Sequence, residues 1–253
     1  ALKDKNMYEN ALIIFSSDNG GPLPAGNNYP LRGGKFSDWE GGIRVNAFVS
    51  GGFLPTAMRG TIQTGLVAGW DWYATVAALA GVDPTDEKAA KAGLPPIDSH
   101  NLWPLISGAN ATSPRSQLEI GSNEGGDEAN RTSGITKVGG LIVPPYKILL
   151  GQGPRNIIDM AGWPGPQSPN ETYVNYQNLT EVCGRTPETG CLFNVWEDPG
   201  EHNNLASTMP TIYNNMLAQA DEVEKGVFSP VRGTDDHVAC QQAIENGFFW
   251  GPF

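Results

Sequence analysis

Residues 11–45 read ALIIFSSDNGGPLPAGNNYPLRGGKFSDWEGGIRV, and this stretch decides the expected fold. Its first six residues, 11–16, form an apolar run rich in Ile and Leu. The run has the length and composition of a strand that is buried on both faces of a parallel sheet. Strands of this kind occur in α/β folds, where helices cover the sheet. The stretch therefore predicts an α/β domain.

Polar residues follow directly at the carboxyl end of this strand. They are Asp18, Asn19, Gly20 and Gly21. Ligands of open α/β sheets bind in the crevice outside such strand ends. Carboxylate and amide oxygens are hard ligands that suit calcium and magnesium, whereas zinc prefers nitrogen and sulfur ligands. Asp18 and Asn19 are therefore candidate metal ligands, although Asp-Asn-Gly-Gly is also an ordinary turn sequence.

Two cations surround a glycine pair a little further along, in Pro-Leu-Arg-Gly-Gly-Lys at residues 30–35. Glycine lets an anion approach the backbone N–H groups closely, and a cationic side chain can hold the anion there. Arg32 and Lys35 are therefore candidate anion-binding residues. A metal and an anion are expected to share one pocket.

Three segments together, SSDNGG, NNYPLRGGKFSDWEGGIRV and DWYATVAALAG, closely resemble the type I sulfatases, and most of all the arylsulfatase B-like enzymes. In that family the Asp-Asn pair after this strand ligates a calcium ion, and the Lys of the PLRGxK segment contacts the sulfate of the substrate. The resemblance implies that Asp18 and Asn19 bind calcium. It also implies that Lys35 is a catalytic residue that contacts the sulfate, with Arg32 beside it in the substrate site.

The resemblance further implies an alkaline-phosphatase-like α/β domain, in which helices flank a mixed or parallel sheet. Residues 1–115 are expected to form the carboxyl-terminal part of this catalytic domain. Residues 116–225 are expected to form a small subdomain of antiparallel strands packed on one helix. Residues 226–253 resemble a tail that packs back on the larger domain.

The apolar pattern predicts the individual elements as well. Asp71 is expected to cap a helix that Gly81 closes. The other expectations are the end of a helix at 2–9, a strand at 43–49, a short helix at 86–92 followed by a loop at 95–104, a strand within 117–126, an edge-type strand pair within 139–151, a loop at 152–182, a strand at 191–196 and a helix at 211–225.

The family's nucleophile is a formylglycine made from the Cys of a Cys-x-Pro-x-Arg motif. None of Cys183, Cys191 and Cys240 stands in such a motif. The chain therefore looks like the carboxyl-terminal half of a sulfatase, and the formylglycine is expected in the missing amino-terminal half. On this interpretation the chain alone is inactive.

The formal net charge is −11, from 16 basic and 27 acidic residues. No basic stripe is present, so a nucleic-acid partner is excluded. No apolar run approaches the length of about 18 residues that a membrane span requires. The expected partner is a sulfated small molecule or glycan, attracted locally by Lys35, Arg32 and Arg44.

Four sequons, at Asn110, Asn130, Asn170 and Asn178, favour a secreted, extracellular or lysosomal glycoprotein.

The cysteines fit the same compartment. Cys183 and Cys191 bracket a short loop and are expected to form a disulfide, worth about 2–3 kcal/mol through loop-closure entropy. Cys240 is left over, and it either pairs with a cysteine of the absent half or is a buried free thiol. The three histidines lack the spacing of zinc ligands.

The predicted reaction of the intact protein is sulfate ester hydrolysis. Two alternatives remain open at this point. One is a non-catalytic pseudoenzyme or glycan-binding protein with a sulfatase-like fold. The other is a phosphoester or phosphonate hydrolase of the same superfamily, which the PLRGGK and WEGG segments disfavour.

Overall fold

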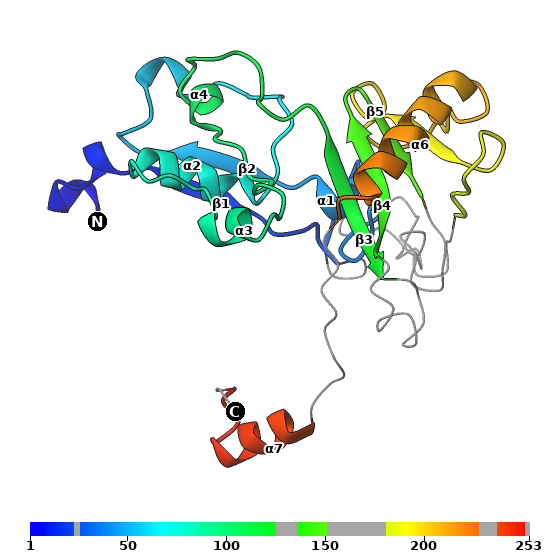
Figure 1. Cartoon of the computed structure of the whole chain (residues 1–253). Helices are drawn as coiled ribbons and strands as arrows, with labels where there is room; N and C mark the ends of the chain where they lie inside the picture. Colours follow the sequence, from blue (N-terminus) through cyan, green and yellow to red (C-terminus); the bar gives the residue numbers. More distant parts are fainter. Residues whose placement is uncertain (23–25, 125–135, 151–180, 228–236, 251–253) are drawn as a thin grey trace, which may run out of the picture.

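The computed structural model describes residues 1–22, 26–124, 136–150, 181–227 and 237–250 (Figure 1). Its elements in chain order are η1 (Lys3–Lys5), η2 (Tyr8–Asn10), β1 (Ile13–Ser16), α1 (Glu40–Ile43), β2 (Ala47–Ser50), η3 (Thr56–Met58), α2 (Asp71–Leu79), α3 (Glu87–Lys91), α4 (Trp103–Ile106), β3 (Leu118–Glu124), β4 (Thr136–Val143), β5 (Tyr146–Leu149), β6 (Cys191–Asn194), α6 (Pro210–Glu224) and α7 (His237–Glu245).

The first strand differs from its prediction. Strand β1 pairs antiparallel with β2, with Ile13 opposite Ser50 and Ser16 opposite Ala47. Its side chains are not buried, and Phe15 stacks on Phe48 at 5.1 Å between ring centroids while both remain about half exposed. The prediction of a parallel strand buried on both faces is wrong for the described residues, because β1 pairs antiparallel with β2 there and three of its four residues are exposed.

The carboxyl-terminal part contains a four-stranded antiparallel sheet in the order β3-β4-β5-β6. Helix α6 packs on β4 and β5, as Figure 1 shows. This arrangement confirms the predicted antiparallel subdomain with one helix. The strand pair that was expected at an edge, β4 and β5, instead forms the centre of the sheet, because β3 and β6 pair on its two outer sides.

Two buried core clusters pack on this sheet. One core cluster lies between the sheet and α6 and contains Leu141, Ile148, Leu150, Leu192, Ala206, Tyr213, Met216 and Ala220. The other contains Trp39, Ile120, Ile142, Leu149, Cys183, Cys191, Phe193 and Val195. Trp39 precedes α1 in the first part of the chain, and it is fully buried against Phe193 with 5.7 Å between ring centroids. A residue from the predicted catalytic segment is therefore part of the subdomain core.

Several local predictions are corrected. Asp71 does not cap α2, because Trp70 holds the N-cap position and the Asp71 carboxylate accepts hydrogen bonds from the backbone N–H groups of Ala68 and His100. The strand expected from residue 43 begins at Ala47, since α1 forms a helical turn over the preceding residues. The expected loop at 95–104 runs into α4, and the expected helix end at 2–9 is two 3-10 turns.

Other local predictions are confirmed. The short helix expected at 86–92 is α3, and Asp86 precedes it as the N-cap residue, accepting hydrogen bonds from the N–H groups of Lys88 and Ala89. Gly81 follows the end of α2 with a φ of +69°. Cys183 and Cys191 form a disulfide with 5.1 Å between their Cα atoms.

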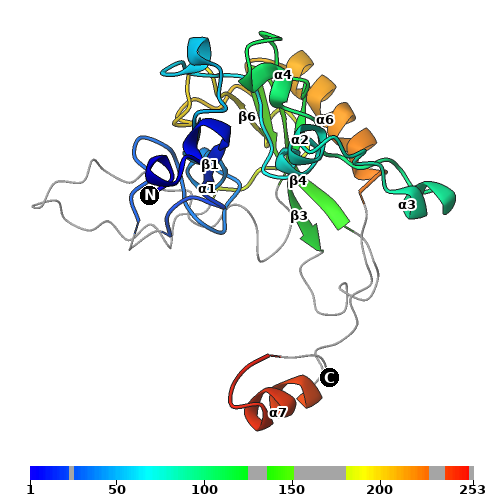
Figure 2. The same cartoon turned by 90° about the vertical axis from the view of Figure 1, so that its left-hand side faces the viewer.

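Two predictions concern the end of the chain and the loop before it. Cys240 is exposed and has no disulfide partner among the described residues, so the alternative of a buried thiol is wrong. The loop expected at 152–182 falls almost entirely outside the described residues. Helix α7 lies apart from the other elements in both views (Figures 1 and 2), and the packing of the tail on the larger domain stays a prediction.

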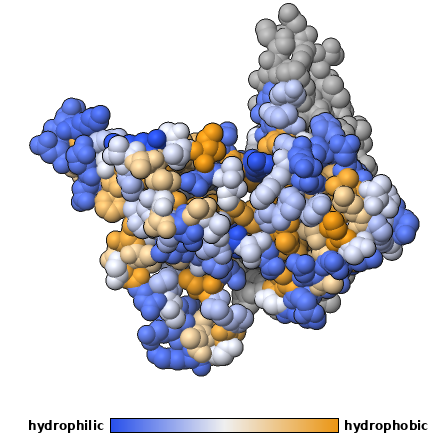
Figure 3. All heavy atoms as spheres, turned by 90° about the horizontal axis from the view of Figure 1, so that it is seen from above, coloured by the Kyte–Doolittle hydropathy of each residue, from blue (hydrophilic) through white to orange (hydrophobic). Residues whose placement is uncertain are grey.

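Large apolar side chains are exposed at several positions of the described surface, including Phe36, Ile62, Trp196 and Phe248. Figure 3 shows hydrophobic patches between hydrophilic areas on one face of the molecule. No helix among the described ranges combines the length and the apolar character needed to cross a membrane.

Trp39 tests the packing between the first part of the chain and the sheet. Trp39→Ala should lower the free energy of unfolding by about 3–5 kcal/mol, because it removes a fully buried indole and leaves a cavity. Trp196→Ala is the matched control, since Trp196 is 64% exposed. Denaturant unfolding measures both, and equal effects of the two substitutions would contradict the core position of Trp39.

Candidate functional site

Three glycine-rich segments form the scaffold of the site. The Gly20 N–H donates to the Gly42 carbonyl at 2.8 Å, and the Lys35 N–H donates to the Gly21 carbonyl at 3.1 Å. A Cβ atom on Gly20 would lie 1.7 Å from the Gly41 carbonyl oxygen, so the backbones approach more closely than a side chain permits. The segments DNGG, LRGGK and WEGG, which are separate in sequence, therefore meet in space.

Asn28 clamps the same segments with its side-chain amide. Its Oδ1 accepts from the Gly21 N–H at 2.7 Å, and its Nδ2 donates to the carbonyls of Gly21 and Gly33 at 2.9 and 3.0 Å. Nothing in the sequence pattern singled out Asn28. It ties the segment with the candidate metal ligands to the segment with the candidate anion ligands.

Asp18 and Asn19 lie where β1 ends. The Asp18 carboxylate is exposed, and its Oδ1 accepts a hydrogen bond from the Asn19 N–H at 3.0 Å. The Asn19 Nδ2 donates to the Gly20 carbonyl at 2.8 Å, which leaves the amide oxygen to face another partner. Both residues line a groove of about 1090 Å³.

The two cations have different surroundings. Arg32 is only 5% exposed, lies 3.7 Å above the Trp39 ring and pairs with the Glu181 carboxylate. Lys35 is half-buried, with its Nζ 5.3 Å from the centroid of the Phe36 ring. Neither is among the residues that line the groove in the described part of the chain. Their contacts with a substrate stay predictions, and Arg32 would have to exchange Glu181 for it.

The groove combines polar and aromatic walls. Its described lining includes Ser16, Ser17, Asp38, Glu40, Arg44, Gln63, Thr64, Trp70, Trp72 and Trp196. Asp38 has a buried Oδ2 with no hydrogen-bond partner among the described residues, and burial raises the pKa of this carboxyl group against the opposing effect of Lys147. The groove thus borders an incompletely satisfied carboxylate.

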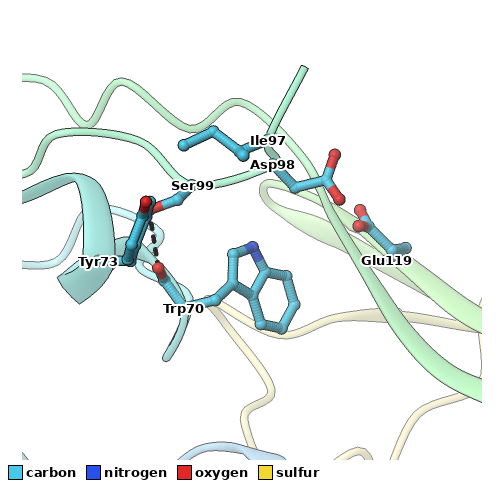
Figure 4. Close-up of a pocket in the computed structure, with 6 residues that line it drawn as sticks. All are labelled: Trp70, Tyr73, Ile97, Asp98, Ser99 and Glu119. Carbon is cyan, nitrogen blue, oxygen red and sulfur yellow. Dashed lines mark hydrogen bonds between the residues drawn. The ribbon is translucent and has the colours of Figure 1, made fainter. Parts of the chain in front are cut away.

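A smaller hollow of about 520 Å³ lies near the start of α2 (Figure 4). Trp70 lines both this hollow and the groove. The remaining walls are Tyr73, Ile97, Asp98, Ser99 and Glu119, and the Ser99 hydroxyl donates to the Trp70 carbonyl at 2.7 Å. Trp70 is therefore shared by the two hollows.

Beneath the groove is a buried charge cluster that the sequence did not indicate. The Lys147 Nζ lies 3.0 Å from Glu40 Oε1 and 2.8 Å from Glu201 Oε1. The Glu201 Oε2 accepts the backbone N–H of Glu40 at 2.7 Å. Lys147 and Glu201 are fully buried and Glu40 is 3% exposed. The one available signal was a lysine within the apolar strand LIVPPYKILL.

The cluster contains two carboxylates and one ammonium. Burial raises the pKa of Glu201 to about 7, helped by Glu40 and opposed by Lys147. Burial alone would lower the pKa of Lys147, but the charges of Glu201 and Glu40 outweigh it and the pKa lies above its usual value. A proton on Glu201 therefore leaves a neutral Lys147–Glu40 pair in the interior.

A second buried ion pair joins Asp71 to Arg115, with Arg115 Nε 2.9 Å from Asp71 Oδ2. Burial would raise the pKa of Asp71, but hydrogen bonds from Arg115 and from the N–H groups of His100 and Ala68, with the charge of Arg115, hold it below its usual value. This pair ties the start of α2 to the segment that leads into β3.

The candidate sites of modification and the histidines are partly described. Asn110 is exposed, and its Oδ1 accepts from the N–H and hydroxyl of Thr112 within the sequon. Asn130, Asn170 and Asn178 lie outside the described residues. The described residues contain no group of three or more His, Cys, Asp or Glu side chains arranged to hold a metal ion.

The family model called Sulfatase matches residues 1–82. Arylsulfatase J of Mus musculus is 31% identical over 262 aligned residues, which cover all of this chain and 41% of that protein. N-acetylgalactosamine-6-sulfatase of Homo sapiens is 33% identical over 110 residues, which cover 42% of this chain and 19% of that protein. The solved structure of the PsFucS1 sulfatase from Pseudoalteromonas sp. has a TM-score of 0.54 at 24% identity, covering 92% of this chain and 40% of that one.

The mixed sheets and helices, shared with these solved structures, define an α/β protein of the alkaline-phosphatase-like fold. The chain belongs to the sulfatase family. It spans 41% of the length of arylsulfatase J.

The raised pKa of Glu201 predicts how stability depends on pH. The carboxyl group has a pKa of about 7 in the folded state and 4.5 in the unfolded state, so the folded state binds its proton more tightly. Proton binding by Glu201 therefore contributes fully to the free energy of unfolding below pH 4.5, and this contribution is lost as pH rises through 7. Wild type should therefore lose stability relative to Glu201→Gln between pH 5 and pH 7.5. Denaturant unfolding at both pH values measures the difference, and parallel pH curves would contradict it.

Proposed function

We propose that this chain supplies part of the active site of a calcium-dependent sulfuric ester hydrolase. The observation that carries the proposal is the meeting of the DNGG, LRGGK and WEGG segments in one glycine-packed scaffold, with Asp18 and Asn19 on a groove. Membership of the sulfatase family and the names of the relatives support the same reaction class.

The side chains of Asp18 and Asn19 carry the type of ligand atom that calcium binds. Both residues line the groove and carry side-chain oxygen atoms, and calcium takes six to eight oxygen ligands. Two residues do not complete that number, so further ligands have to come from outside the described residues, from water or from the substrate. When bound, calcium would supply positive charge that stabilises negative charge on sulfate oxygens.

Lys35 is proposed to add a second positive charge. Its backbone N–H bonds to Gly21, so the loop that carries it is attached to the loop that carries the metal ligands. A fixed ammonium near the sulfate would favour the charge that develops in the transition state. The nucleophile implied by the family resemblance, a formylglycine, has no counterpart motif in these 253 residues. The chain's own residues therefore contribute binding and charge stabilisation.

The proposed substrate is a sulfate ester of a sugar or glycan. Trp70, Trp72 and Trp196 on the groove offer aromatic faces for the apolar side of a sugar ring, and Gln63 and Thr64 offer groups that hydrogen-bond hydroxyls. The name of the human relative, N-acetylgalactosamine-6-sulfatase, supports this class.

We also propose a secreted or lysosomal location. A disulfide persists in oxidising compartments, and Cys183–Cys191 is one. The exposed sequon at Asn110 agrees with glycosylation on the secretory route.

Asp18→Ala tests the metal site. In the full-length enzyme the variant should lose stoichiometric calcium binding and the rise in melting temperature that calcium causes, because it removes the charged ligand. Asp83→Ala is the control, since Asp83 is an exposed carboxylate on the loop after α2. Calorimetric titration measures calcium binding in both variants. Wild-type calcium stoichiometry in Asp18→Ala would contradict the metal site and leave the DNGG segment as an ordinary turn.

Lys35 tests the sulfate contact. Lys35→Ala should lower kcat by about 10²–10³-fold with little change in melting temperature, because one transition-state charge is lost. Lys35→Arg keeps the charge on a planar group of different reach, so partial recovery is expected. Steady-state kinetics on a sulfate ester measure this in an enzyme that carries the formylglycine. A normally folded Lys35→Ala enzyme with kcat within about twofold of wild type rejects the role.

A further inference from the structure

We propose that Lys147 and Glu201 are positioning residues for the calcium- and sulfate-binding loops, and that they act through the backbone of the WEGG segment. The inference rests on the proposed roles of Asp18, Asn19 and Lys35. Neither residue touches the groove in the described part of the chain, whereas Glu40, which both contact, does line it.

The first step is the anchor between the two parts of the chain. Lys147 projects from β5 toward Glu40 of α1 at 3.0 Å, and Glu201 follows β6 and reaches the same ammonium at 2.8 Å. Glu201 also accepts the backbone N–H of Glu40 at 2.7 Å. Because the three side chains are buried, these interactions are screened much less than surface ion pairs. The backbone at Glu40 is therefore held at one place on the sheet.

Glu201 carries a sign of this constraint in its own backbone. Its φ is +54°, a left-handed conformation that residues with a side chain rarely adopt. Glycine would fit this conformation without strain, yet the position holds a carboxylate with two buried partners. The cost of the backbone conformation is offset by what the side chain binds.

The second step runs from the WEGG segment to the loops. The Gly42 carbonyl accepts the Gly20 N–H at 2.8 Å, two residues after Asp18. The Gly41 N–H donates to the Arg32 carbonyl at 2.7 Å, three residues before Lys35. The backbones of the three segments approach so closely that a Cβ atom on Gly20, Gly41 or Gly42 would collide with a carbonyl oxygen. A displacement of Glu40 would therefore be transmitted to both loops.

The consequence is a fixed separation between the metal ligands and Lys35. A misplacement of about 1 Å at a catalytic group can cost about 10²-fold in rate. Partners one shell away from metal ligands typically contribute 10–100-fold to metal affinity. Lys147 and Glu201 would affect both the rate and the calcium affinity in this way, acting from the sheet on the first part of the chain.

Amide hydrogen exchange of the full-length, calcium-free enzyme tests the transmission directly, with peptides that cover residues 17–22 and 30–36. Lys147→Met and Glu201→Ala should each speed the exchange of the Gly20 and Lys35 amides about tenfold. Each substitution removes a contact that holds Glu40 on the sheet. Glu201→Gln should stay near wild type, since its amide oxygen can still accept the Glu40 N–H and Lys147 keeps Glu40.

Asp71→Asn is the matched control. It weakens the other buried ion pair, with Arg115, and should lower the melting temperature without changing exchange in either peptide. Exchange in Lys147→Met and Glu201→Ala that equals this control overturns the inference. If Lys147→Met does not fold, the comparison of Glu201→Ala with Glu201→Gln decides, because equal exchange in these two variants is the overturning result.

Calcium titration of the same variants separates the inference from the proposed function. Weakening of calcium binding by about tenfold in Lys147→Met and Glu201→Ala, with Glu201→Gln and Asp71→Asn near wild type, supports positioning. If Asp18→Ala abolishes calcium binding but Lys147→Met and Glu201→Ala bind like Asp71→Asn, the inference fails and the proposed function stands. If Asp18→Ala binds calcium normally, the proposed metal site fails, while the exchange data still decide whether the anchor holds the loops.

Discussion

The ammonium of Lys147, between the carboxylates of Glu40 and Glu201, is the interaction on which the arrangement of this chain depends. Three ionisable groups taken out of water are costly unless each is paired, and here each has a charged partner within 3.0 Å. The hydrogen bond from the Glu40 N–H to Glu201 adds direction to the attraction. The cluster therefore joins α1 to the antiparallel sheet at a defined orientation.

Trp39 makes the same junction with apolar contacts. It fills the sheet face opposite α6, and Arg32 stacks on it from the loop that leads to Lys35. Burial of the indole and pairing of the neighbouring Glu40 thus act on adjacent residues. The small subdomain therefore holds a segment of the proposed active site, through its apolar core and through Lys147 and Glu201.

The glycine contacts explain how one anchored segment can organise two loops. Gly20, Gly41 and Gly42 allow carbonyl oxygens to approach where a Cβ atom would collide, so backbone hydrogen bonds connect loops directly. Asp18 and Asn19 lie on the groove, and the Lys35 N–H donates to the Gly21 carbonyl of the same scaffold. Backbone hydrogen bonds therefore hold together segments that are separate in sequence.

The sequence by itself determined the strand before Asp18, the disulfide and the helix at 211–225, because these depend on local composition and short spacings. The antiparallel subdomain was predicted through the resemblance to the sulfatases. The sequence did not determine that β1 would be exposed and antiparallel, or that β4 and β5 would be central, since pairing partners are distant in the chain. Only the tertiary structure brought together Glu40 and Lys147, which are 107 residues apart. A buried charge is recognisable only once its partners are known, because burial without them would be unfavourable.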